Sequence, residues 1–210
     1  MTTTKERPIL FSGAMVSAIL DGRKTQTRRI ISPQPTVDER GLLWWKWSKY
    51  SGSANIERLG QPSDDWLARC PYGQPGDRLW VREAFMHEPA DYCWEASVSI
   101  PVRPATTIYR ADSDPRGEAK GCGWKPSIHM PRALSRITLE ITGVRVERLQ
   151  EINEEDARAE GVGPLRSDGR MRNGTPAIDG YADLWESING AGSWAVNPWV
   201  WVVEFRRVAA

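Results

Sequence analysis

The sequence predicts a single mixed α+β domain of 210 residues, built as a small, mostly antiparallel β-barrel with short helices and long loop insertions. Five or six segments have strand-like composition, and one of them alternates apolar and polar residues along its length. Short helical segments lie between them and end at glycines. Long stretches rich in Gly, Pro and Ser, without periodicity, separate these elements. Closure into a barrel would remove the exposed edges of such a sheet.

The first helix is expected at residues 12–22. Ser12 is a candidate N-cap, apolar residues recur at helical spacing, and Gly22 suits the left-handed backbone that follows a helix end. The chain then becomes extended over residues 25–31 and stops at two nearby prolines. This order predicts a helix followed at once by a strand.

The middle of the chain carries the clearest β pattern. Strands are expected at residues 78–83, after a Gly-Asp turn, and at 106–110. Residues 137–149 alternate so regularly that they predict either two strands or one long bent strand. A short helix over 153–160 should follow, since an asparagine can cap it, acidic residues fill its first turn and Gly161 ends it.

The C-terminal part predicts a third helix over residues 181–188, ended by Asn189-Gly190, and a closing strand from Trp199 to Phe205. The whole chain, 1–210, is treated as one domain. Its core covers about 8–33, 76–85, 106–110, 126–162 and 181–207, and its insertions cover about 34–75, 86–125 and 163–180.

Charge and cysteine content exclude several classes of protein. The net charge is +1, with 28 basic and 27 acidic residues, so no global field draws the chain onto nucleic acid. Arginines gather at residues 23–29 and 132–148, which leaves room for one local basic face or for arginines in solvated strand-edge positions. An apolar signal core and an apolar run of membrane-spanning length are both missing, which predicts a cytoplasmic protein without a membrane partner.

The cysteines and histidines predict no metal and no cofactor. The three cysteines lie far apart in sequence and are expected to be reduced, and neither Cys-x-x-Cys nor His-x3-His spacing occurs. Eleven tryptophans is an unusually high number. Most of them are expected to anchor the core and the loops, and one or two are candidate platforms for stacking on a base.

The most informative stretch is Gly22-Arg23-Lys24-Thr25-Gln26-Thr27-Arg28-Arg29, directly after the first helix. It places a cation that can act as acid, base or anion anchor three residues from a hydroxyl that can act as a nucleophile. Guanidinium groups on both sides can hold an anionic or planar substrate.

In order along the chain, these motifs resemble the ASCH domain of the PUA-like superfamily. They are the helix ending Gly-Arg-Lys-Thr-x-Thr-x-Arg, the Gly76-Asp77-x-Leu-x-Val strand start, the short helix ending Ala-Glu-Gly and the final apolar strand. The tryptophan-rich version is similar to the ASCH proteins of phages and prophages. The resemblance implies a PUA-like barrel whose cleft receives RNA or a nucleoside. Small bacterial members hydrolyse N4-acetylcytidine to cytidine and acetate, and other members have been assigned ribonuclease activity.

The resemblance also implies a catalytic set, in which Lys24, Thr27 and Glu160 match the lysine, threonine and glutamate of the amidohydrolases. Thr27 would attack the amide carbonyl, neutral Lys24 would take its proton, and Glu160 would hold the lysine or protonate the leaving amine. A regular strand would send Lys24 and Thr27 to opposite faces, so Lys24 must lie in the bend after Gly22. A helix end favours the lysine cation, so a base role requires burial or opposing charge from Arg23 and Arg29.

Further candidates for substrate contacts are Glu83 at a strand end, His129 as a base contact and Arg132 as a phosphate contact. Three other interpretations stay open. Lys24 and Glu160 form only an ion pair between two helix ends; the chain is a non-catalytic RNA-binding module; or it is a metal-independent ribonuclease in which Thr27 merely positions RNA.

Overall fold

A computed structural model gives the structure of the chain. It describes residues 4–37, 39, 43–46, 53–56, 67–88, 91–95, 98–103, 106–112, 124–163, 171 and 174–208.

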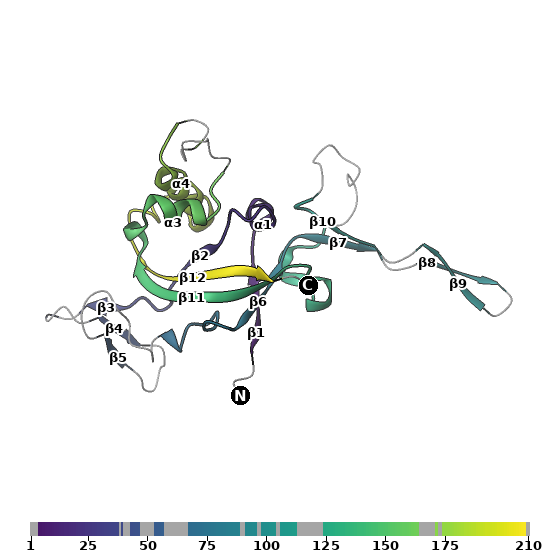
Figure 1. Ribbon diagram of the computed structural model, residues 1–210, viewed down its shortest axis with the longest axis horizontal. Coiled ribbons are helices and arrows are strands. Elements are labelled where there is room, and N and C mark those ends of the chain that lie inside the picture. The colour runs from purple at the N-terminus through teal and green to yellow at the C-terminus, as the bar shows by residue number, and fades with distance from the viewer. Residues whose placement is uncertain are drawn as a thin grey trace.

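A five-stranded sheet forms the centre of the molecule (Figure 1), in the order β1-β6-β11-β12-β2. Only β1 and β6 run parallel, and every other neighbouring pair is antiparallel. The predicted α+β class with a mostly antiparallel sheet is therefore confirmed. The strands are β1 (Glu6–Leu10), β2 (Gln26–Ile30), β6 (Arg78–Arg82), β11 (Thr138–Arg148) and β12 (Trp199–Val208).

The two edge strands, β1 and β2, are joined by a side chain. Arg29 on β2 donates from its Nη2 to the backbone oxygen of Leu10 on β1 over 2.7 Å. No backbone ladder between these strands is found in the described part of the chain, so closure of the barrel stays a prediction. Strand β1 itself lies outside the strands predicted from the sequence, because Pro8 and the charged residues beside it hide its period.

The long strand β11 settles one of the alternatives left open by the sequence. It is one strand of 11 residues, and its pairing with β12 shifts register between Ile141 and Gly143. Such a bulge bends and twists a strand, and Figure 1 shows β11 and β12 curving together. A Cβ on Gly143 would lie 2.6 Å from Oε2 of Glu204, so glycine also permits this close approach.

In the described ranges, three α-helices that are described from end to end and three short 3-10 turns connect the strands. The predicted helix ends are confirmed at Gly22 and Gly161, which have positive φ values of 73° and 77°, and Asn153 caps its helix by accepting from the backbone of Asp156. The helices are α1 (Gly13–Leu20), α3 (Glu154–Ala159) and α4 (Ala177–Asn189), and the turns are η1 (Ser127–His129), η2 (Arg132–Leu134) and η3 (Leu149–Glu151).

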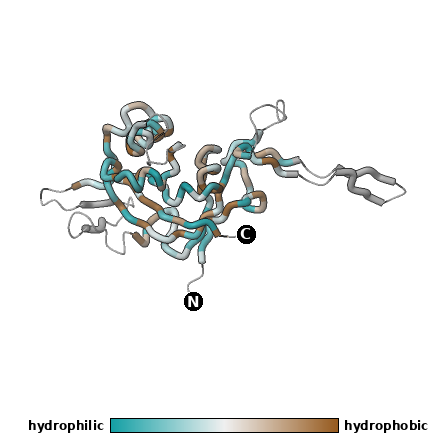
Figure 2. Tube along the Cα trace, turned by 45° about the horizontal axis from the view of Figure 1, so that its top comes forward, coloured by the Kyte–Doolittle hydropathy of each residue, from teal (hydrophilic) through white to brown (hydrophobic). Residues whose placement is uncertain are grey.

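Apolar side chains pack on both faces of β12, and the apolar segments recur along the main sheet and its neighbouring helices (Figure 2). On one face, Trp201 and Val203 join a core that includes Phe11 and Ile19. On the other face, Val200 and Val202 pack with α3 and α4, including Tyr181 and Trp185. Burial on both faces makes β12 the strand on which the sheet and the helical layer meet.

Strands also occur in two regions predicted to be irregular insertions. A three-stranded sheet comprises β3 (Thr36–Val37), β4 (Leu43–Lys46) and β5 (Ser53–Ile56), and a hairpin comprises β8 (Asp91–Glu95) and β9 (Val98–Arg103). The predicted strand at 106–110 is present as β10 (Thr106–Tyr109), but it pairs with β7 (Phe85–Glu88) outside the main sheet. These short strands lack a sustained apolar period, which explains why the sequence did not reveal them. No helix in the described ranges is long and apolar enough to cross a membrane.

Candidate functional site

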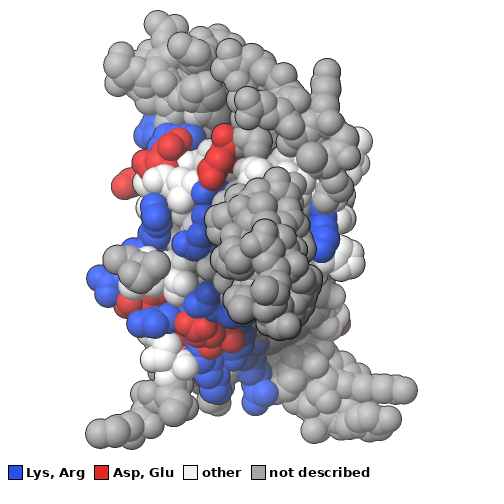
Figure 3. All heavy atoms as spheres, turned by 90° about the vertical axis from the view of Figure 1, so that its right-hand side faces the viewer, with Lys and Arg blue, Asp and Glu red and all other residues white. Residues whose placement is uncertain are grey.

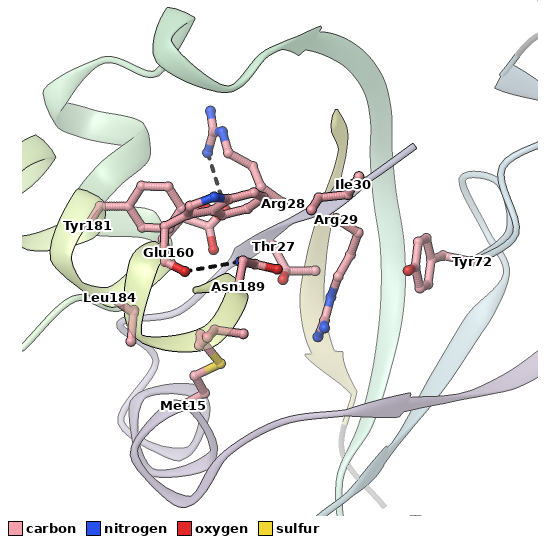
Figure 4. A pocket seen from close by; sticks show the side chains of 12 residues that line it. Met15, Thr27, Arg28, Arg29, Ile30, Tyr72, Glu160, Tyr181, Leu184 and Asn189 are labelled. Atoms are coloured by element: carbon pink, nitrogen blue, oxygen red, sulfur yellow. Dashed lines mark hydrogen bonds and ion pairs between the residues drawn. The ribbon is translucent and has the colours of Figure 1, made fainter. Parts of the chain in front are cut away.

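A cavity of about 130 Å³ lies where β2, α1 and α4 meet. Figure 4 shows Thr27 of β2 among the side chains around it, with Tyr181 and Leu184 on one side and Arg29 and Tyr72 on the other. Its volume is comparable with a cavity of about 150 Å³ that holds one benzene ring in another protein. The lining residues are Met15, Thr27, Arg28, Arg29, Ile30, Tyr72, Glu160, Tyr181, Leu184, Trp185, Ile188 and Asn189.

Lys24 lies in the bend that the sequence analysis required. The backbone N–H groups of Arg23 and Lys24 both donate to the carbonyl of Ala18, so the chain turns sharply after α1. Lys24 then forms an isolated antiparallel bridge with Glu160 before β2 begins at Gln26. Two helix ends thus bring together residues that are 136 positions apart.

The Lys24 ammonium group is wholly enclosed. Its Nζ donates to Glu160 Oε2 over 2.8 Å and to the Glu160 backbone oxygen over 2.7 Å, and it lies 5.6 Å from the centre of the Phe11 ring. The exposed fraction of the Lys24 side chain is 0%, and that of Glu160 is 3%. Besides its bond to carbon, the amine nitrogen has three positions for hydrogens or a lone pair. The two hydrogen bonds to Glu160 use two of these positions, so the third stays available for another group.

Burial lowers the pKa of Lys24. The charge of Glu160 and its hydrogen bond oppose this shift, and the positive charges of Arg29 and Arg28 add to it. Burial and these two arginines therefore disfavour the charged form of Lys24, which is the condition for its role as a base. Arg28 takes the place expected for Arg23, whose side chain is exposed and pairs with Asp21 over 2.9 Å.

Arg28 fixes Glu160 from the other side. Its Nη1 lies 3.2 Å from Glu160 Oε1, and the same guanidinium group pairs with Glu147 and, over 2.8 Å, with Asp156. Arg145 extends this network through its own pairs with Glu147 and Asp156. Since both oxygens of Glu160 are engaged, the carboxylate is held in one orientation toward Lys24.

Thr27 opens into the cavity. Thr27 pairs with Val203 of β12 and is 3% exposed. Its hydroxyl makes no hydrogen bond with the described residues. Thr27 and Arg29 share one face of β2, being two residues apart. The Arg29 guanidinium lies 5.3 Å from the centre of the same Phe11 ring that Lys24 Nζ approaches. Lys24 itself is not among the residues that line the cavity, where its partner Glu160 lies.

Two aromatic residues of α4 complete the cavity and were missed as site residues in the sequence. Tyr181 and Trp185 are spaced four apart, a pattern that predicts only the buried face of a helix. Burial raises the pKa of Tyr181, so its hydroxyl stays protonated. The Trp185 Nε1–H is buried and has no acceptor within the described part of the chain. A buried aromatic donor beside a cavity is a signal that only the fold reveals.

Three further sequence candidates do not line the cavity. Glu83 is buried and bound through both oxygens to Arg136, at 2.9 and 3.0 Å. His129 is exposed on η1, and Arg132 pairs at the surface with Glu6 over 3.0 Å. The strand end that carries Glu83 leads to β7 instead of to the cavity, because β7 pairs outside the main sheet.

The tight contact behind Lys24 supplies a test of the geometry. A Cβ on Gly161 would lie 2.8 Å from Lys24 Cβ and 2.9 Å from Ala18 Cβ, whereas a Cβ on Gly22 meets nothing within 4 Å. Both glycines have positive φ. We therefore expect Gly22→Ala to lower the free energy of unfolding by about 1 kcal/mol through backbone strain alone. Gly161→Ala should cost about 1–3 kcal/mol more and displace Lys24. Urea denaturation measures both, and equal losses would contradict the placement of Lys24.

On the face shown in Figure 3, basic and acidic side chains are interspersed instead of forming one continuous basic surface. No cluster of three or more His, Cys, Asp or Glu side chains suited to a metal ion occurs among the described residues. In comparisons with known proteins, no family model, no curated protein and no solved structure matches the chain.

Proposed function

We propose that the chain is an ASCH-type, PUA-like hydrolase that removes the N4-acyl group from a cytidine-like nucleoside or from RNA that carries one. The observation that carries the proposal is the cavity itself. A threonine hydroxyl without a hydrogen-bond partner among the described residues faces a space the size of one ring, next to an enclosed Lys24–Glu160 pair. Nucleophile, base and orienting carboxylate are the three parts of an acyl-transfer site.

The proposed reaction proceeds through an ester on Thr27. Thr27 Oγ1 adds to the acyl carbon while its proton passes to neutral Lys24 Nζ, directly or through one water. The C–N bond then breaks, and Lys24 returns the proton to the leaving nitrogen to give cytidine. Water adds to the ester and gives a proton to Lys24. Collapse returns this proton to Thr27 Oγ1 and releases acetic acid, which ionises.

Glu160 acts in this scheme by position. Its carboxylate and backbone oxygen hold Lys24 Nζ, and Arg28 holds the carboxylate in turn. Burial lowers the pKa of Lys24 and so favours the neutral amine that can take the proton of Thr27.

The dimensions of the cavity favour a nucleoside whose sugar stays outside. One pyrimidine-sized ring fills a cavity of about 130 Å³. Ile30, Ile188 and Asn189 line it and are themselves exposed, so they mark its outer side, where a ribose or an RNA chain would leave.

The proposal is tested by incubating the purified chain with N4-acetylcytidine in the presence of a chelator and separating the products by chromatography. We expect cytidine and acetate in equal amounts. Labelled RNA under the same conditions separates the alternatives. Salt-sensitive RNA binding without product from either substrate would indicate a binding module, and RNA cleavage without cytidine release would indicate a ribonuclease.

A further inference from the structure

The cavity has an unusual excess of unpaired hydrogen-bond donors. Arg29 Nε and Trp185 Nε1 are both buried and have no acceptor among the described residues, and both residues line the cavity. Both groups are donors only. A buried donor without a partner costs about 1–3 kcal/mol, so two of them in one small cavity call for acceptors from outside the chain.

The charged acceptor of the cavity is already engaged. Both Glu160 oxygens are bound to Lys24 and Arg28, and the hydroxyls of Thr27 and Tyr181 can donate as well as accept. A ligand that brought carbonyl oxygens into this space would satisfy the two unpaired donors, whereas a ligand that brought only further N–H groups would leave them unpaired.

We propose that this cavity selects its ligand by two carbonyl oxygens, one bound by the Nε–H of Arg29 and the other by the Nε1–H of Trp185. This inference rests on the proposed function. Arg29 shares a face of β2 with Thr27, so its donor meets the oxygen of the acyl group that Thr27 attacks. Trp185 lines the cavity from α4, and its Nε1–H meets the carbonyl oxygen of the pyrimidine ring.

The arrangement distinguishes substrate from product. An N4-acylated ring presents two carbonyl oxygens, whereas cytidine presents one carbonyl and an amino group that only donates. Removal of the acyl group thus leaves Arg29 Nε without its acceptor, and the product binds less tightly than the substrate.

The test measures equilibrium binding by calorimetry in a Thr27→Val background, which cannot form the ester. The probes are N4-acetylcytidine and N4-ethylcytidine, which has nearly the same size but lacks the acyl oxygen. We expect the acetyl compound to bind roughly tenfold more tightly. Arg29→Lys keeps the positive charge but loses the Nε donor, and it should abolish this preference. Trp185→Phe should weaken both ligands by roughly three- to tenfold without changing the preference.

Trp199→Phe is the matched control. Trp199 is also buried with an Nε1–H that lacks an acceptor in the described ranges, but it does not line the cavity, so its substitution should change neither affinity. The inference is overturned if Trp185→Phe binds both ligands as its parent does, or if Arg29→Lys keeps the preference. If either of these results is found and the wild-type chain still releases cytidine, the proposed recognition of two carbonyl oxygens is wrong and the proposed hydrolysis stands. If the ligands bind as expected but the wild-type chain releases no cytidine, the proposed hydrolysis is wrong. If neither ligand binds, both proposals are wrong.

Discussion

Thr27→Val should reduce the rate of cytidine release from N4-acetylcytidine by at least about a thousandfold, because valine keeps the size of the side chain but removes the attacking hydroxyl. The Thr27 hydroxyl has no hydrogen bond to other described residues, and the pairing of Thr27 with Val203 on β12 is a backbone pairing that valine keeps. The midpoint of thermal unfolding should therefore change little. The measurement is kcat/KM for cytidine release at a pH at which the wild-type chain is most active.

Thr25 supplies the control for this experiment. It lies two residues before Thr27 but is exposed, and it does not line the cavity. Thr25→Val should keep nearly full activity. Comparable activity in Thr27→Val and Thr25→Val would show that the hydroxyl of Thr27 is not the nucleophile.

Glu160→Ala should lower the free energy of unfolding by about 3–5 kcal/mol, the cost of breaking a buried ion pair by removing one member. The Lys24 and Arg28 side chains are both 0% exposed, so neither can turn to solvent when the carboxylate is lost. Arg28 keeps the carboxylates of Glu147 and Asp156, whereas Lys24 keeps no carboxylate among the described residues, only the backbone oxygen of residue 160 and the face of the Phe11 ring. Most of the loss therefore falls on Lys24.

Urea denaturation measures this loss, and Asp21→Ala is its control. Asp21 pairs with Arg23 at the surface, and removal of such a pair changes stability by no more than about 1 kcal/mol. A loss in Glu160→Ala no larger than in Asp21→Ala would show that the Lys24–Glu160 pair is not buried as described.

The ends of two helices could be predicted from the sequence, because the residues that end or cap a helix lie beside it in the chain. Gly22 and Gly161 end their helices with positive φ, and Asn153 caps the second of them. The meeting of Lys24 and Glu160 followed from a family resemblance, and the structure confirms their contact. The nucleoside substrate stays a prediction.

The remainder of the site depends on packing between distant segments. Trp185 belongs to the cavity because α4 packs on β12, and no property of its own segment distinguishes it from a core residue. Glu83 is engaged because Arg136, 53 residues away, binds it with two hydrogen bonds. Such pairings are set by tertiary structure, which the spacing of residues within a segment does not encode.

The claim that a buried, neutral Lys24 activates Thr27 is tested most directly by the pH dependence of cytidine release. Burial lowers the pKa of Lys24 from the ordinary value of 10.5, and only the neutral amine can accept a proton. In the wild-type chain, kcat/KM should therefore rise with pH to a plateau, and the midpoint of the rise should lie below pH 10.5. Lys24→Met should remove both this rise and nearly all of the activity. Release that is independent of pH, or a Lys24→Met chain that keeps the wild-type rate, would contradict the account.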